Sequence, residues 1–159
     1  MSKNKAILSI IAAVCVCTLS RVSYVSAVSK ADLLQQKINA YRASQGIAPL
    51  KTSTTLTLVA KERARQMFTY GSFTHGSAYV KTYRQLLAPY AFKISLGGEN
   101  LARNTKTTDV TLRLWHTSAG HAKLLDEPRF THVGIAVVYG AFMGKNTTIT
   151  VAVFGKKSS

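Results

Sequence analysis

The chain has 159 residues, with 21 Lys and Arg against 6 Asp and Glu, and its formal net charge at pH 7 is +15. This length is enough for one domain with a substantial core and too short for two. The positive charge favours anionic partners, namely anionic components of a cell envelope or lipid, whereas the lack of a zinc-finger, helix-turn-helix or RNA-binding motif argues against nucleic acid.

The first 27 residues have the pattern of a secretory signal peptide. Two lysines precede an apolar run from Ala6 to Leu19, which is too short to span a bilayer comfortably, and small residues follow up to Ala27. Both cysteines lie in this leader, so the domain that follows has no disulfide. We therefore predict a signal peptide at 1–27 and a single exported domain at 28–159, with no transmembrane anchor after cleavage.

Apolar residues at helical spacing predict four helices. They lie at about 30–44, from a Ser53 or Thr54 cap to near Gly71, at about 79–87 and at about 108–119. On the second helix the charged residues are expected mostly on the solvent side, and these are Lys61, Glu62, Arg63 and Arg65. On the fourth, Trp115 is predicted to face the core and His116 to face solvent, and Gly120 is predicted to break the helix so that His121 turns away from it.

Three segments have the pattern of strands. They are 92–102, with a bend at its two glycines, and 131–139 and 147–154, which form an antiparallel pair around a loop at 140–146. In 131–139 neither alternating face is plainly polar, so the sheet must be covered on both sides. The sequence therefore predicts an α+β fold, a three-layer α-β-α sandwich with a small, mainly antiparallel sheet between helices.

Four short stretches combine polar residues with glycine, and these are 72–77, 96–102, 115–121 and 130–136. Three of them contribute a histidine and one contributes Glu99. Glu99 lies in an otherwise apolar strand, where an ionised carboxylate needs a partner to offset its desolvation. A pair of histidines would suit that role.

Six motifs occur together in the order and spacing of one known family. They are Asn39, Arg42, Gly46 and Leu50, then Phe73 and His75, "GEN" at 98–100, "W..S.GH" at 115–121, "VGIA" at 133–136 and a closing "VFG". In this combination the chain resembles the CAP superfamily, also called the SCP domain, and within it the bacterial exported members without cysteines. The resemblance covers about the whole domain and implies the same three-layer sandwich.

The resemblance also implies a cleft lined by two histidines and acidic residues, at positions that match His75, His121 and Glu99. Ser118 stands where eukaryotic members have a second glutamate, which puts any mechanism with two carboxylates in question. Bacterial relatives often continue after the second histidine with Arg, any residue and Asn, whereas residues 122–124 here are Ala, Lys and Leu.

Three other polar residues have competing interpretations. Asn39 and Arg42 match a family position, but they also suit a solvated helix face. His132 shares a strand face with small residues, so it lies either at the rim of the cleft or within the core. Of these two, packing in the core is the favoured interpretation.

Three functions compete for this chain. His75 and His121 suit a divalent metal ion such as Zn, with Glu99 as a third ligand or as the group that orients a histidine, and no other cofactor is expected. A peptidase-like hydrolase would use the same cleft, with catalytic candidates His75, Glu99, Ser118 and His121, although no nucleophile elbow or oxyanion hole surrounds the serine. The third is a lipid or sterol carrier.

The apolar residues of "YRQLLAPYAF" at 83–92 would suit the lining of a lipid groove, but packing in the core also explains them. We therefore expect a secreted or periplasmic domain that acts at the cell envelope or toward a host, and whether it is an enzyme stays open.

Overall fold

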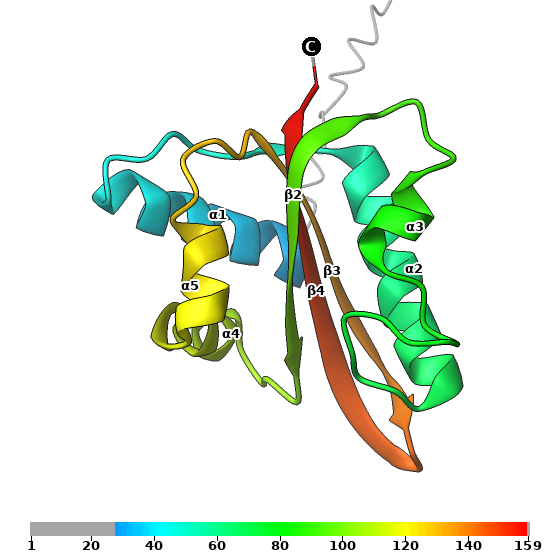
Figure 1. The fold of residues 1–159 in the computed structure, drawn as a ribbon. Helices are drawn as coiled ribbons and strands as arrows, with labels where there is room; N and C mark the ends of the chain where they lie inside the picture. Colours follow the sequence, from blue (N-terminus) through cyan, green and yellow to red (C-terminus); the bar gives the residue numbers. More distant parts are fainter. Residues whose placement is uncertain (1–27, 159) are drawn as a thin grey trace, which may run out of the picture.

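The computed structural model describes residues 28–158, so the predicted signal peptide at 1–27 lies outside the described residues. Nine elements follow one another along this part of the chain (Figure 1). In order they are α1 (Lys30–Ser44), β1 (Lys51–Thr52), α2 (Thr54–Tyr70), α3 (Tyr83–Leu87), β2 (Ile94–Arg103), α4 (Thr108–Thr117), α5 (Ala119–Leu125), β3 (His132–Phe142) and β4 (Lys145–Lys157).

The four strands form one sheet in the order β1-β3-β4-β2, which leaves β2 as an edge strand. β1 pairs with β3 in parallel, and the other pairings are antiparallel. The predicted loop at 140–146 is wrong, because β3 and β4 continue until Phe142 pairs with Lys145. Met143 and Gly144 alone make the turn, with φ of 50° and 77°. Positive φ angles at both positions of a two-residue hairpin match the right-handed twist of its two strands.

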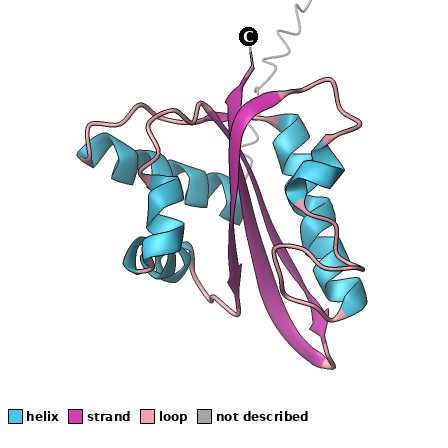
Figure 2. Cartoon of the chain, in the orientation of Figure 1, coloured by secondary structure: helices cyan, strands magenta, loops and turns pink. Residues whose placement is uncertain are grey.

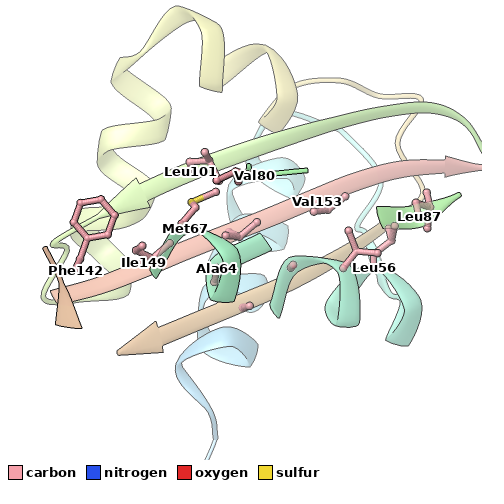
Figure 3. Close-up of a cluster of buried hydrophobic side chains, with 13 residues drawn as sticks. Leu56, Ala64, Met67, Val80, Leu87, Leu101, Phe142, Ile149 and Val153 are labelled. Carbon is pink, nitrogen blue, oxygen red and sulfur yellow. The ribbon is translucent and has the colours of Figure 1, made fainter. Parts of the chain in front are cut away.

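Helices cover both faces of the sheet, as the two apolar strand faces predicted (Figures 1 and 2). α1, α4 and α5 lie on one face and bury Leu34, Ile38 and Trp115 against it. α2 and α3 lie on the other, where a second apolar cluster runs from Leu56 to Phe142 (Figure 3). The predicted three-layer α-β-α sandwich is therefore confirmed.

The first two helices follow their predicted ends. α1 has the predicted bounds, and α2 begins after Ser53, whose side chain accepts from the backbone N–H of Leu56. α2 ends at Gly71, which has a φ of 58° and is therefore in the left-handed conformation that favours glycine. The third helix is shorter than predicted, because Thr82 caps it and residues 79–82 lie outside it.

The fourth predicted helix is two helices. α4 ends at Thr117, Ser118 has the extended angles φ −101° and ψ 115°, and α5 begins at Ala119. The prediction that Gly120 breaks the helix is wrong, since Gly120 lies inside α5 and His121 follows it there. The break lies at Ser118, which is the C-cap residue of α4 and the N-cap residue of α5.

β2 does not bend at its glycines as predicted. Gly97 and Gly98 pair regularly with β4, and the irregularity lies earlier, between Ile94 and Leu96. The glycines serve close packing on the two faces: a Cβ on Gly98 would lie 2.6 Å from Leu124 of α5, and one on Gly97 would lie 3.1 Å from the Tyr83 ring of α3.

Within residues 28–158 the structure has no helix with the length and apolar character needed to cross a membrane.

Candidate functional site

Two buried charges meet between α2 and the edge strand β2. Arg63 donates from Nε to Glu99 Oε2 at 2.6 Å and from Nη2 to Oε1 at 2.9 Å. The Arg63 side chain is 0% exposed and that of Glu99 is 2% exposed. Arg63 thus supplies the opposite charge that the buried carboxylate of Glu99 was predicted to need. The bidentate geometry of the pair fixes the orientation of Glu99.

Arg63 also holds the loop that carries His75. Its Nη2 donates to the carbonyl of Thr74 at 2.7 Å, and its Nη1 donates to the carbonyl of Lys81. Thr74 precedes His75 in the chain and Lys81 follows it, so the two bonds hold the loop between them. The Nδ1 atom of His75 is 2.9 Å from Glu99 Oε1. The His75 side chain is 62% exposed, and its ring is oriented by the buried carboxylate through Nδ1.

The next residue of the strand faces the other layer. Side chains alternate along a strand, so Asn100 points away from Glu99 and its Nδ2 donates to the carbonyl of His121 in α5 at 3.2 Å. Because β2 is the edge strand, the loop of His75 and helix α5 approach the same edge from opposite faces (Figure 1). Glu99 and Asn100 of the "GEN" motif therefore each hold one histidine-bearing segment.

The pKa of His121 is lowered in the folded chain. Burial lowers its pKa from the ordinary value of 6.5, and the charge of His75 lowers it further. The Nδ1 atom of His121 is buried and has no hydrogen-bond partner among the described residues. Glu99 thus contacts the His75 ring, and the neighbouring Asn100 of the same strand bonds the backbone of His121.

The carboxylate of Glu99 is already fully engaged by neighbouring side chains. Both oxygens of Glu99 are engaged by Arg63, and one of them also by His75. Residues 28–158 contain no group of three or more His, Cys, Asp or Glu side chains placed to hold a metal. The imidazoles of His75 and His121 are the side chains here that could hold a divalent ion, and Glu99 would then orient His75.

Ser118 is the fourth predicted site residue. It lies at the junction of α4 and α5, and its side chain makes no capping hydrogen bond. Among the described residues its hydroxyl has no hydrogen bond to His75 or His121. The apolar residues proposed for a lipid groove, Tyr83, Leu86, Leu87 and Phe92, pack against the core on the α2 side.

Arg42 and Asn39 do not form a solvated helix face. Arg42 is 0% exposed, and it donates to the carbonyls of Ala48, Leu125, Glu127 and Phe130. Asn39 bonds both the N–H and the C=O of Leu50, at 2.8 and 3.0 Å. Both residues therefore stabilise the chain between the elements, and neither reaches the histidine pair.

The two remaining histidines lie away from the pair. His116 is exposed, as predicted, and its ring meets the Tyr41 ring edge-on at 5.0 Å between centroids. His132 is half-buried beside Phe92, with 5.5 Å between the ring centroids. Burial lowers the pKa of His132, and Lys157 and Lys51 lower it further.

Arg63 is the residue that sequence reasoning missed. It is one of four charged residues predicted to lie mostly on the solvent side of the helix, yet it lies three residues after Ala60 and four before Met67, both 0% exposed. That spacing places it on the apolar stripe. A cation on an apolar stripe and a carboxylate in an apolar strand each require an opposite charge, and this shared requirement is the signal that pairs them.

The chain matches a known family over most of the described residues. The family model described as CAP, the cysteine-rich secretory protein family, matches residues 35–154. The uncharacterized protein YkwD of Bacillus subtilis strain 168 is 31% identical over 121 residues, which are 76% of this chain and 46% of YkwD. The chain thus spans about half the length of that relative.

Solved structures share the fold. An outer surface protein from Borrelia burgdorferi is similar with a TM-score of 0.69 and 25% identity, over 79% of this chain and 91% of that one. An extracellular protein containing a SCP domain from Bacillus anthracis strain Ames also has a TM-score of 0.69, with 23% identity over 80% of this chain and 40% of that one. At this second level of identity the likeness is one of fold alone.

Proposed function

The chain belongs to the CAP family of cysteine-rich secretory proteins, and we propose that it is an exported CAP domain that binds a divalent metal ion such as Zn through His75 and His121. It acts at the cell envelope or toward a host. Similar proteins named as outer-surface and extracellular support the proposed location, as does the leader pattern at residues 1–27.

The observation that carries the proposal is the orientation of His75. A histidine that binds a metal usually donates its other ring N–H to a carboxylate, which fixes the tautomer and raises the basicity of the ligating nitrogen. His75 Nδ1 lies 2.9 Å from Glu99 Oε1, and Arg63 holds that carboxylate in place. Its other nitrogen therefore belongs to an exposed ring that is already oriented for a ligand.

His121 is suited to be the second ligand because its lowered pKa keeps the imidazole neutral near pH 7. Only a neutral imidazole has a lone pair to give to a metal. When bound, such an ion would polarise water or an anionic group of a ligand. The affinity for the metal should fall as the pH drops, because protons compete with the metal for the imidazole nitrogens.

The test is calorimetric titration of the purified chain with Zn²⁺. We expect saturable binding of one ion, and we expect His75→Ala and His121→Ala each to abolish it or to weaken it at least tenfold. Glu99→Gln keeps the shape of the side chain and should weaken binding by about 10- to 100-fold, the range measured for partners of metal-bound histidines.

The chain supplies matched controls in its other two histidines. His116→Ala removes an exposed imidazole on α4, and His132→Ala removes one beside Phe92. Both variants should bind Zn²⁺ as the parent chain does. Equal weak heats in the parent, His75→Ala and His116→Ala would show adsorption by scattered histidines and would overturn the proposal.

A further inference from the structure

A second polar site lies at the end of the molecule where the β3–β4 turn, the end of β2 and the end of α2 come together, at the lower end in Figure 1. A groove of about 480 Å³ opens there beside Phe142 and Met143. Its polar lining is Arg103, Asn104, Lys145, Asn146 and Thr147. The volume is in the range of small-ligand sites, and none of the residues of the histidine pair lines it.

The polar groups of this groove are donors without partners. Among the described residues no hydrogen bond engages the side chains of Asn104, Lys145 or Asn146, and Thr147 Oγ1 is buried without a partner. A guanidinium, an ammonium, two amides and a hydroxyl without any carboxylate form a set suited to an anion rich in oxygen acceptors, such as a phosphodiester.

Arg103 is positioned before any ligand arrives. Its guanidinium carbon lies 4.7 Å from the centroid of the Phe142 ring and 5.5 Å from that of Phe73. Two aromatic contacts restrict the side chain, so less conformational entropy is lost when it binds an anion. Phe142 is 6% exposed and belongs to the core cluster, so this platform is rigid.

The rim of the groove is apolar and exposed. Met143 is 77% exposed at the tip of the hairpin, although it has a positive φ of 50°, a conformation that Asn, Asp or Gly would adopt more easily. A Cβ on Gly71 would lie 3.3 Å from its Cγ, so Met143 reaches the end of α2. Tyr70, beside that glycine, and Tyr79 are 52% and 71% exposed, with their rings 6.0 Å apart.

No acidic side chain lines the groove. The chain has 6 acidic residues. Four of them, Asp32, Asp109, Asp126 and Glu127, lie in or directly after the helices of the opposite layer. Glu99 is buried against Arg63, and Glu62 is paired with Arg65. The end of the molecule at the hairpin tip therefore complements a negative surface.

We propose that this groove binds the phosphate headgroup of an anionic phospholipid at a membrane surface. Arg103 and Lys145 bind the phosphate oxygens, and Met143, Tyr70 and Tyr79 lie at the boundary of headgroups and acyl chains, where amphipathic side chains are favoured. The combination of phosphate donors with an exposed apolar rim favours a lipid surface over a soluble phosphate compound.

The experiment is co-sedimentation of the protein with vesicles, because it separates charge from apolar contact. Vesicles that contain phosphatidylglycerol should bind the protein at low salt, and vesicles of pure phosphatidylcholine should not. Each cation removed near such a surface weakens binding by about fivefold. Arg103→Gln/Lys145→Gln should therefore lower the partition coefficient by roughly 25-fold.

Met143→Asn separates loss of binding from loss of folding. Asn is favoured in the turn, so the thermal midpoint should stay the same or rise while vesicle binding falls several-fold. The matched control is Arg113→Gln/Leu114→Ser, which removes one cation and one apolar side chain, 48% exposed, from α4 in the opposite layer. This control should bind vesicles as the parent does.

Three results would overturn the proposal. The first is equal binding to neutral and anionic vesicles. The second is an unchanged partition coefficient in Arg103→Gln/Lys145→Gln. The third is displacement of the protein from vesicles by millimolar glycerol phosphate, because the groove would then be a site for soluble phosphate compounds.

Discussion

Arg63 and Glu99 form a bidentate ion pair, with 2.6 Å between Nε and Oε2 and 2.9 Å between Nη2 and Oε1, although both side chains are buried. The pair connects α2 to the edge strand β2 and, through the carbonyls of Thr74 and Lys81, to the loop of His75. A buried pair of this kind contributes little net stability over an apolar pair. Its value lies in the fixed position that it gives to His75.

Breaking the pair should destabilise the protein strongly. Arg63→Met leaves the carboxylate of Glu99 buried without its cation, and we expect the free energy of unfolding in urea to fall by about 3–5 kcal/mol. The double variant Arg63→Met/Glu99→Leu should regain most of that loss, because no unpaired charge remains. Arg65→Met is the control, since Arg65 pairs with Glu62 at the surface, where ion pairs contribute little to stability. Equal losses in the two single variants would contradict this account.

His121 should titrate below pH 6.5 in an NMR titration of the folded chain. Burial is the larger cause of the lowered pKa, and the charge of His75 is the smaller one. His75→Asn should therefore raise the pKa of His121, but not to its ordinary value. A pKa of His121 that is the same in both proteins would mean that the two imidazoles are not coupled.

Stability should fall as the pH drops below about 6.5. His121 and His132 both have a lowered pKa in the folded chain, so the unfolded chain binds protons more readily and the stabilisation present above pH 6.5 is lost as the pH falls through the folded-state values. Glu62 and Glu127 have lowered pKa values too, but their stabilisation is lost only below about pH 4.5. His121→Asn should flatten the dependence of the urea midpoint on pH between about 5 and 6.5, whereas a slope unchanged in this variant would rule out the contribution of His121.

Two glycines should respond in opposite ways to alanine. A Cβ on Gly134 would lie 2.1 Å from backbone atoms of Leu56 and Thr57, so Gly134→Ala must displace α2 from the sheet and should cost several kcal/mol. Gly120 lies inside α5 with nothing within 4 Å of its Cβ position, so Gly120→Ala should stabilise the protein by about 0.5–1 kcal/mol. Thermal unfolding of both variants tests this, and a destabilised Gly120→Ala would restore the idea that this glycine interrupts a helix.

The sequence was most informative where a pattern is local. The bounds of α1, the Ser53 cap and the Gly71 end of α2 follow from side chains within a few residues of each other. The two covered faces of the sheet likewise follow from alternation within β3 and β4. These features need no knowledge of what lies across the fold.

Features that depend on distant partners were predicted poorly. The burial of Arg63 depends on Glu99, 36 residues away, and that of Arg42 depends on carbonyls between Leu125 and Phe130. The sequence "TSAG" at 117–120 continues a helical pattern, so the helix break at Ser118 is not visible in it. The extended conformation of Ser118 depends on how α4 and α5 each pack on the sheet. His75, Glu99 and His121 were brought together on the family resemblance, because their spacing contains no metal motif.

The proposed metal site is tested most directly by the ring nitrogen chemical shifts of the four histidines during a titration with Zn²⁺. Proton–nitrogen correlation spectra of the ¹⁵N-labelled chain distinguish a protonated, a free and a metal-bound imidazole nitrogen. We predict that Nε2 of His75 and one nitrogen of His121 shift together to metal-bound values with one saturation curve, while His75 Nδ1 stays protonated toward Glu99 and the rings of His116 and His132 do not change. Unchanged nitrogens in His75 and His121 at saturating Zn²⁺, or equal shifts in all four histidines, would contradict the account.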